Sequence, residues 1–236
     1  MKLPIVCAQC MHDDLPNAAR LAGIEFRDDG LYEITCPKGH KAITLLQQQK
    51  FEILFDIGAY AVTDGYYREA VSSFTSSIER FYEFFIKAAL YNKKYTADMV
   101  SPAWKHVSNQ SERQLGAFIF LYLSEFGHSP TLLSNSNTQL RNEVIHKGKI
   151  PSRAEAMAYG QAVLDVVRPI LVETQKAFSE GVQQTILQHL MSARSKAEEG
   201  LAVATMAIPT ILSLSVSEEG YRERTLEKAI TELRRW

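Results

Sequence analysis

Cysteine is scarce in this sequence: three residues occur in 236, and all of them lie within the first 36 positions. An odd number of cysteines excludes a fully paired disulfide framework of the kind that small secreted domains use. The opening segment MKLPIVCAQC also lacks the apolar run of a secretory signal peptide. We therefore expect a protein of the reducing cytoplasm.

Long apolar runs and a surplus of positive charge are missing as well. The longest uncharged stretch, residues 200–217, is interrupted by Gly200, Pro209 and several hydroxyl side chains. It favours a buried helix followed by a loop or strand over a membrane span, so we expect no membrane partner. The 26 basic and 27 acidic side chains give a formal net charge of −1, which excludes a generic nucleic-acid coat protein. Any contact with nucleic acid must therefore be local.

Helical periodicity dominates the chain from about residue 47 onward. The residues before it contain short β-like pieces at 31–35 and 42–45. The pattern predicts a mainly α fold with a small β-rich segment at the N-terminus. Three parts are expected: a zinc-ribbon-like domain at 1–46, an antiparallel helical bundle at 47–178 and a helical C-terminal extension at 179–236.

The three cysteines and one histidine form a pattern typical of a zinc site. Cys7 and Cys10 are separated by two residues, and Cys36 and His40 lie on one predicted turn built by Pro-Lys-Gly. Two such pairs supply the four ligands of a tetrahedral structural zinc site, which leaves no open position for catalysis. A β-rich domain this short needs such a staple to fold. His12 is an alternative fourth ligand, and three unrelated buried cysteines are the alternative to a metal site.

Basic residues cluster at 141–153, RNEVIHKGKIPSR, where Glu143 is the single acid. Arg141 and His146 are five residues apart on a predicted short helix, so their side chains diverge by about 140°. Asn142 and His146 are four apart and share a face. Arg141 and His146 can therefore converge on one substrate only if the helix is frayed near Arg141 or if two chains each supply part of the site.

The pattern Arg141-Asn142-x-x-x-His146 resembles the R-x4–6-H signature of the HEPN superfamily, the higher eukaryotes and prokaryotes nucleotide-binding domain. The His-Lys-Gly-x-Ile-Pro that follows, and the capped helix after it, are similar to those of many bacterial members. The preceding segment YREAVSSFTSSIERFYEFF fits the same bundle. The resemblance covers roughly residues 50–178 and leaves out the zinc-like segment and the tail.

The resemblance implies an HEPN-like antiparallel bundle that forms a homodimer and brings two copies of the signature helix together. Many active members are metal-independent endoribonucleases, in which the 2′-hydroxyl of RNA attacks the adjacent phosphate. His146 would then be the general acid or base, and Arg141 would hold the phosphate. Asn142 would orient His146 or donate to the phosphate.

Three further basic residues belong to the expected RNA-binding surface: Lys147, Lys149 and Arg153. The implied partners are an RNA substrate, a second copy of the chain and a regulatory protein or antitoxin, because we expect a toxin or an effector of antiviral defence. Zinc would be structural, and catalysis would need no cofactor.

The alternative function is a non-catalytic dimeric module that recognises a nucleic acid or a protein partner, since superfamily members without nuclease activity also exist. On this hypothesis the basic run is a solvated helix face and His146 is a structural histidine. Arg141 would form a salt bridge with Glu79 or Glu83.

Overall fold

The computed structural model describes residues 2–13, 20–214 and 224–233. The fold is mainly helical, with 60% of the residues in helices and a small β-sheet region. At this level the predicted fold class is confirmed. The β-like pieces expected near the N-terminus are strands, as described below.

The chain divides into two compact units, each built from separate stretches of sequence. The small unit holds the residues up to Gln48 together with Ile186–Ile208. The helical unit holds Gln49–Thr185 together with Pro209–Leu233. This differs from the expected series of three consecutive domains, because the chain returns to the small unit after the helices.

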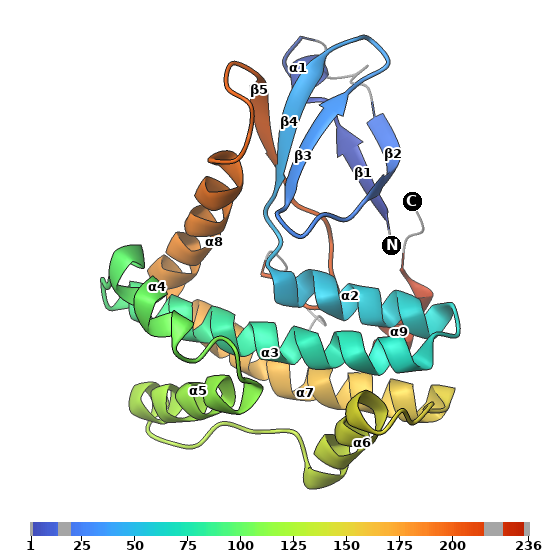
Figure 1. The fold of residues 1–236 in the computed structure, drawn as a ribbon, viewed down its shortest axis with the longest axis vertical. Coiled ribbons are helices and arrows are strands. Elements are labelled where there is room, and N and C mark those ends of the chain that lie inside the picture. Colours follow the sequence, from blue (N-terminus) through green and yellow to red (C-terminus); the bar gives the residue numbers. More distant parts are fainter. Residues whose placement is uncertain (1, 14–19, 215–223, 234–236) are drawn as a thin grey trace. The chain divides into compact units, whose positions relative to one another are not determined.

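The helical unit is built around α3 (Tyr67–Asn92), which buries aromatic side chains along most of its length. Helix α3 contacts α2, α4, α5, α6 and α7, and α9 packs on α2 and α7 (Figure 1). The bounds of these helices are α2 (Lys50–Thr63), α4 (Ala97–Lys105), α5 (Ser111–Phe126), α6 (Asn135–His146), α7 (Arg153–Ala177) and α9 (Leu226–Thr231). Phe74, Phe81 and Phe85 of α3 are fully buried, so this helix supplies the centre of the hydrophobic core.

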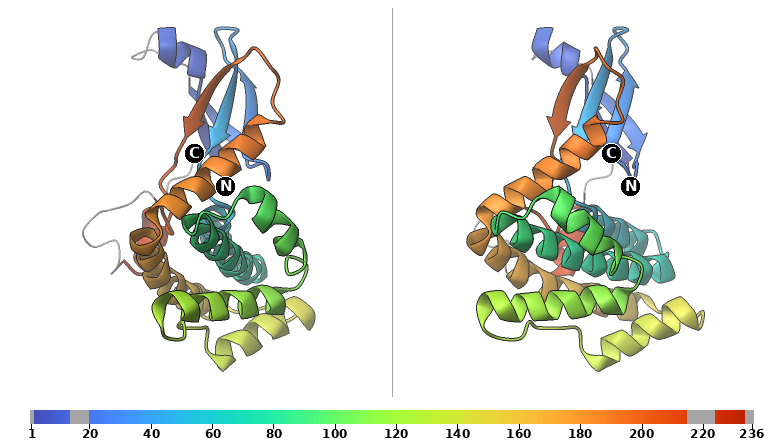
Figure 2. Two further views of the ribbon diagram at one scale, coloured as in Figure 1. Left: turned by 90° about the vertical axis from the view of Figure 1, so that its left-hand side faces the viewer. Right: turned by 60° about the vertical axis from the view of Figure 1, so that its left-hand side comes forward.

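Helices α5 and α6 lie on the side of α3 opposite to α2 (Figure 2). The sequence of α5, SERQLGAFIFLYLSEF, is apolar around most of the helix, but only Gln114, Phe118 and Tyr122 are buried. Phe120 is 74% exposed and Leu123 is 39% exposed. A helix that is apolar on several faces is normally covered on all of them, so α5 presents an uncovered apolar face.

The small unit contains two short sheets. Its elements are β1 (Lys2–Val6), α1 (Ala8–Asp13), β2 (Arg20–Glu25), β3 (Leu31–Thr35), β4 (Lys41–Leu46) and β5 (Ala202–Met206). Strands β1 and β2 pair antiparallel, and the second sheet has the order β3-β4-β5. Leu31, Ile43 and Leu45 pack against Ala193 of α8 (Ser179–Arg194) to form a core cluster.

The C-terminal extension is helical only in part, which corrects the prediction for 179–236. Strand β5 pairs in parallel with β4, with Ala202 opposite Ala42 and Met206 opposite Leu46. Parallel pairing depends on a partner far away in sequence, and the uncharged segment AVATM fits an edge position beside β4. Residues 215–223 and 234–236 of the expected helical extension lie outside the described residues.

The uncharged stretch 200–217 contains β5. No helix among the described residues is long and apolar enough to cross a membrane. The stretch instead provides β5 and the segment around Ile208, Ile211 and Leu212, whose side chains are buried.

Candidate metal centre and candidate active site

The expected metal ligands come together in the small unit. The sulfurs of Cys7, Cys10 and Cys36 and a ring nitrogen of His40 all lie within 4.8 Å of one another. The three cysteines are buried and form no disulfide, and His40 is half-buried. This group could hold a metal ion, and its fourth member is His40 rather than His12.

The spacing of these ligand atoms fits a tetrahedral ion. The sulfurs of Cys10 and Cys36 are 3.8 Å apart, and Cys10 Sγ lies 3.3 Å from His40 Nδ1. A tetrahedron with metal–sulfur distances of about 2.3 Å has sulfur–sulfur edges of about 3.8 Å. The turn that brings Cys36 and His40 together is closed by a 2.8 Å hydrogen bond from Gly39 N to Cys36 O, with Gly39 at φ 84°. Glycine adopts this left-handed conformation without strain.

Helix α6 carries the expected catalytic residues on an unbroken helix. Its N-cap is Ser134, whose Oγ accepts a 3.3 Å hydrogen bond from Asn137 N. Arg141 and Asn142 are half-buried, whereas His146 is exposed at the last helical position. Arg141 Nη1 donates to Asn142 Oδ1 at 3.0 Å, so the amide oxygen of Asn142 orients the arginine.

The regular helix keeps Arg141 and His146 apart within one chain. Arg141 lies well inside α6, so fraying does not turn it toward His146, and the two side chains diverge by about 140°. Among the described residues no hydrogen bond joins Asn142 to His146. The route through a frayed helix is therefore not observed, and the route through two chains stays a prediction.

The three expected RNA-binding residues differ in their surroundings. Lys149 Nζ lies 3.1 Å from a carboxylate oxygen of Glu143 and 2.9 Å from one of Glu155. These ion pairs connect the end of α6 to the start of α7 and neutralise Lys149. Lys147 and Arg153 are exposed.

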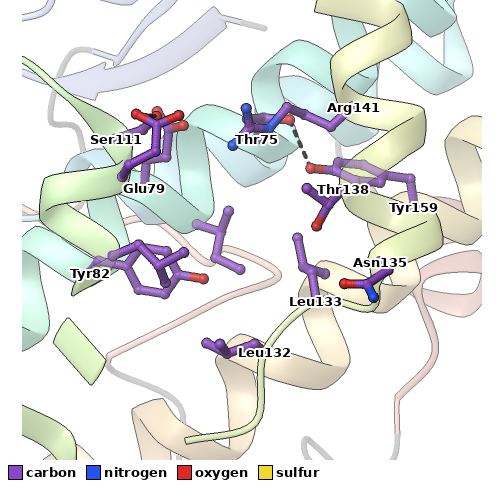
Figure 3. A pocket seen from close by; sticks show the side chains of 13 residues that line it. Thr75, Glu79, Tyr82, Ser111, Leu132, Leu133, Asn135, Thr138, Arg141 and Tyr159 are labelled. Carbon is purple, nitrogen blue, oxygen red and sulfur yellow. Dashed lines mark hydrogen bonds between the residues drawn. The ribbon is translucent and has the colours of Figure 1, made fainter. Parts of the chain in front are cut away.

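A pocket of about 260 Å³ opens beside Arg141 in the helical unit (Figure 3). In Figure 3, Arg141 extends from α6 toward Glu79 and Ser111, and Leu132 and Leu133 lie on another side of the pocket. The pocket thus has a polar side at Glu79 and Ser111, and a mixed side on which Asn135 and Thr138 lie beside Leu133. Its lining residues are Thr75, Ile78, Glu79, Tyr82, Ser111, Glu112, Leu115, Leu132, Leu133, Asn135, Thr138, Arg141 and Tyr159.

Glu79 and Tyr82 are among the polar side chains of this pocket that form no side-chain hydrogen bond within the described part of the chain. Neither the carboxylate of Glu79 nor the hydroxyl of Tyr82 forms a hydrogen bond or an ion pair there. Burial raises the pKa of Glu79, and the charge of Arg141 partly offsets this rise. By contrast, Thr75 Oγ1 and Tyr159 Oη lie 2.9 Å apart and satisfy each other. Glu79 is thus a partly desolvated acceptor directed at an open space.

Acidic groups surround the signature arginine. Glu79 and Glu112 line the same pocket as Arg141. The pKa of Glu112 is lowered, first by a hydrogen bond from its own backbone, then by Ser111 and by the charges of Arg141 and His146. Of the two expected acidic partners of Arg141, Glu79 lies in the same pocket without forming an ion pair with it, whereas Glu83 pairs with Arg80 and Lys87.

The spacing of polar residues on α3 is the feature of the sequence that indicates this pocket. Thr75, Glu79 and Tyr82 follow one another at steps of four and three residues on α3, so they share a helix face. Polar groups on such a face of an otherwise aromatic helix indicate a cavity or an interface. Glu112 and Tyr159 come from α5 and α7, and only the packing of the helices brings them to the site.

Comparison of the chain with models of known protein families, with curated proteins and with solved structures finds no match.

Proposed function

We propose that this protein is a metal-independent endoribonuclease whose helical unit is an HEPN-like bundle. The observation that supports this most is the Arg141, Asn142 and His146 set on one regular helix. Asn142 holds the arginine, and His146 is accessible at the helix end. The spacing of the three residues is that of the superfamily signature.

The proposed reaction uses the RNA strand as its own nucleophile. The 2′-oxygen attacks the adjacent phosphorus, and the bond from phosphorus to the 5′-oxygen breaks, which leaves a 2′,3′-cyclic phosphate and a 5′-hydroxyl. His146 takes the proton of the 2′-hydroxyl or gives one to the departing oxygen, because imidazole exchanges protons near neutral pH. Arg141 binds the phosphate and stabilises the charge that grows on its oxygens. Lys147 and Arg153 attract the RNA backbone.

We infer that the working enzyme is a homodimer. Arg141 and His146 point in different directions on α6, so a complete site needs Arg141 of one chain and the partner's His146. The exposed apolar face of α5 that contains Phe120 and Leu123 lies in the same unit and supports a contact between copies. The partner would cover this face and complete the site.

We assign the Cys3His group to structural zinc. Three thiolates and one imidazole form a soft ligand set that zinc prefers, and four protein ligands leave no position for a substrate. The proposed setting is the cytoplasm, where the thiols stay reduced. A role as toxin or antiviral effector, with a regulatory protein or antitoxin as partner, is supported by the resemblance alone.

Arg141→Ala and His146→Ala should each lower the rate of cleavage of single-stranded RNA by about 100-fold or more, because each removes a group that acts on the transition state. His106→Ala is the matched control, since His106 is also an exposed histidine at the end of a helix. Rates are measured on purified proteins of equal helical content and oligomeric state. Equal rates for the wild type and His146→Ala would contradict the proposal.

One observation favours a non-catalytic binding module as the second candidate. The pocket beside Arg141 is also lined by Glu79 and Glu112. Their negative charges oppose the binding of a polyanion such as RNA at this arginine. Expression in bacteria separates the two functions. An active nuclease should be poorly tolerated and its His146→Ala variant well tolerated, whereas a binding module should give the same phenotype with either residue.

A further inference from the structure

We propose that the pocket beside Arg141 recognises an unpaired guanine base that carries a phosphate. The inference rests on the proposed function, because it names the base next to the phosphate that Arg141 would hold. It goes further in assigning a base preference to one carboxylate, Glu79.

The size and walls of the pocket suit one flat base. Its volume of about 260 Å³ lies just below the range of about 300–1,000 Å³ that drug-sized ligands occupy. A single ring system therefore fits. Leu115, Leu132 and Leu133 supply apolar walls, while Glu79 and Ser111 lie along a polar side (Figure 3). A nucleobase has the same division between apolar faces and a polar edge.

Glu79 decides which base can bind. An ionised carboxylate only accepts hydrogen bonds, and its two oxygens pair best with two neighbouring donors. Guanine is the one RNA base with two adjacent donors, N1–H and N2–H, on its Watson–Crick edge. Because Glu79 has no donor among the described residues and burial raises its pKa, these two bonds would replace the water that the pocket removes.

Arg141 places the phosphate next to that base. One of its nitrogens, Nη1, is engaged with Asn142 Oδ1, and the guanidinium keeps other N–H groups for a phosphate. Arg141 and Glu79 line one pocket from α6 and α3. The phosphate of a guanine nucleotide would therefore bind Arg141, and the N–H groups of its base would bind Glu79.

Calorimetric titration with the four nucleoside 3′-monophosphates tests the inference, with the His146→Ala protein used so that RNA added later is not cut. Guanosine 3′-monophosphate should bind about 10-fold or more tightly than the other three, and Glu79→Gln should remove this preference. Glu69→Gln is the matched control, because Glu69 is an exposed acid of the same helix. Tyr82→Phe removes only a hydroxyl and should weaken guanosine binding selectively, which keeps the test valid if Glu79→Gln does not fold.

Short uridine-rich RNAs with a single guanosine or adenosine distinguish the two sources of the ligand. If the RNA that contains guanosine binds more tightly than guanosine 3′-monophosphate, the ligand of the pocket is RNA. If the two bind equally tightly, the ligand is a free guanine nucleotide. Equal affinity for all four mononucleotides, or a guanine preference unchanged in Glu79→Gln, overturns the inference. If the wild-type protein prefers guanine but cuts no RNA, the proposed nuclease activity is refuted and the proposed guanine site is supported. If it cuts RNA but binds all four bases equally, the nuclease activity is supported and the guanine site is refuted.

Discussion

Two buried acids on α2 make the stability of the helical unit depend on pH. Glu52 accepts a hydrogen bond from Leu214 N at 3.0 Å, and Asp56 accepts one from Ile211 N at 2.9 Å. Burial raises the pKa of Glu52 to about 7 and that of Asp56 to about 8, from ordinary values of 4.5 and 3.8. Between the ordinary and the raised pKa of each acid, the folded state binds more protons than the unfolded state. Its stability therefore falls as the pH rises from about 4 to about 8.

Asp56→Asn should flatten this pH dependence. The asparagine oxygen can still accept a hydrogen bond from Ile211 N but carries no charge. Between pH 5 and pH 8.5 the variant should therefore lose less stability than the wild type, by on the order of 1–3 kcal/mol. Urea unfolding at both pH values measures the difference, and contributions from the metal ligands cancel between the two proteins. The exposed acid Asp165 serves as the control through Asp165→Asn. An unchanged slope in Asp56→Asn would show that the carboxyl is ionised in the folded protein across this range.

At the residue scale, a contact could be predicted from the sequence when its two residues are close together along the chain. Cys36 and His40 were predicted as ligands because one tight turn holds both, and the structure brings them together with Cys7 and Cys10. The ion pairs of Lys149 link residues of two helices. The sequence analysis assigned this lysine to the expected RNA-binding surface and did not predict its ion pairs with Glu143 and Glu155.

At the scale of elements, the proposed two-chain site rests on the geometry of α6. Its regular helix keeps Arg141 and His146 on different faces, and in the proposed homodimer the second copy would cover the apolar face of α5. Elements that need a distant partner were harder to predict. Helix α3 follows from its own apolar spacing, whereas β5 exists because β4 supplies its hydrogen bonds.

Mixing two inactive variants tests the shared site. If each site combines Arg141 of one chain with the partner's His146, a heterodimer of Arg141→Ala and His146→Ala chains has one site that lacks both residues and one that is complete. Co-refolded mixtures should therefore recover a substantial part of the cleavage rate, while each variant alone stays inactive. Phe120→Asp, which places a charge on the exposed face of α5, should prevent this recovery. No recovery in heterodimers verified by mass would contradict a site shared in this way.

At the scale of the whole molecule, the two units differ in what stabilises them. The helical unit has a large aromatic core around α3, whereas the small unit relies on short sheets, a small core cluster and the Cys3His group. Small domains of this kind commonly need a metal to fold. The sequence indicated the β-rich start and the helical middle but could not show that residues 186–208 complete the small unit, since that depends on long-range pairing.

Loss of the metal should therefore unfold the small unit and leave most of the helical signal. Cys36→Ser removes one of the four proposed ligands, so the variant should lose the zinc that we propose for the wild type and become sensitive to protease within residues 2–46. Its far-ultraviolet circular dichroism should change little, because most helices belong to the helical unit. His12→Ala is the control and should keep one zinc per chain. A zinc content that falls in His12→Ala but not in His40→Ala would contradict the ligand assignment.

The chemical nature of the RNA ends after cleavage distinguishes attack by the 2′-hydroxyl from other ways of cutting RNA. Purified wild-type protein and His146→Ala are incubated with single-stranded RNA in EDTA, and both product ends are mapped. Under the proposed mechanism only the wild type cuts, and it leaves 5′-hydroxyl and 2′,3′-cyclic phosphate ends. Cleavage by His146→Ala at the wild-type rate, or products with 5′-phosphate ends, would contradict it.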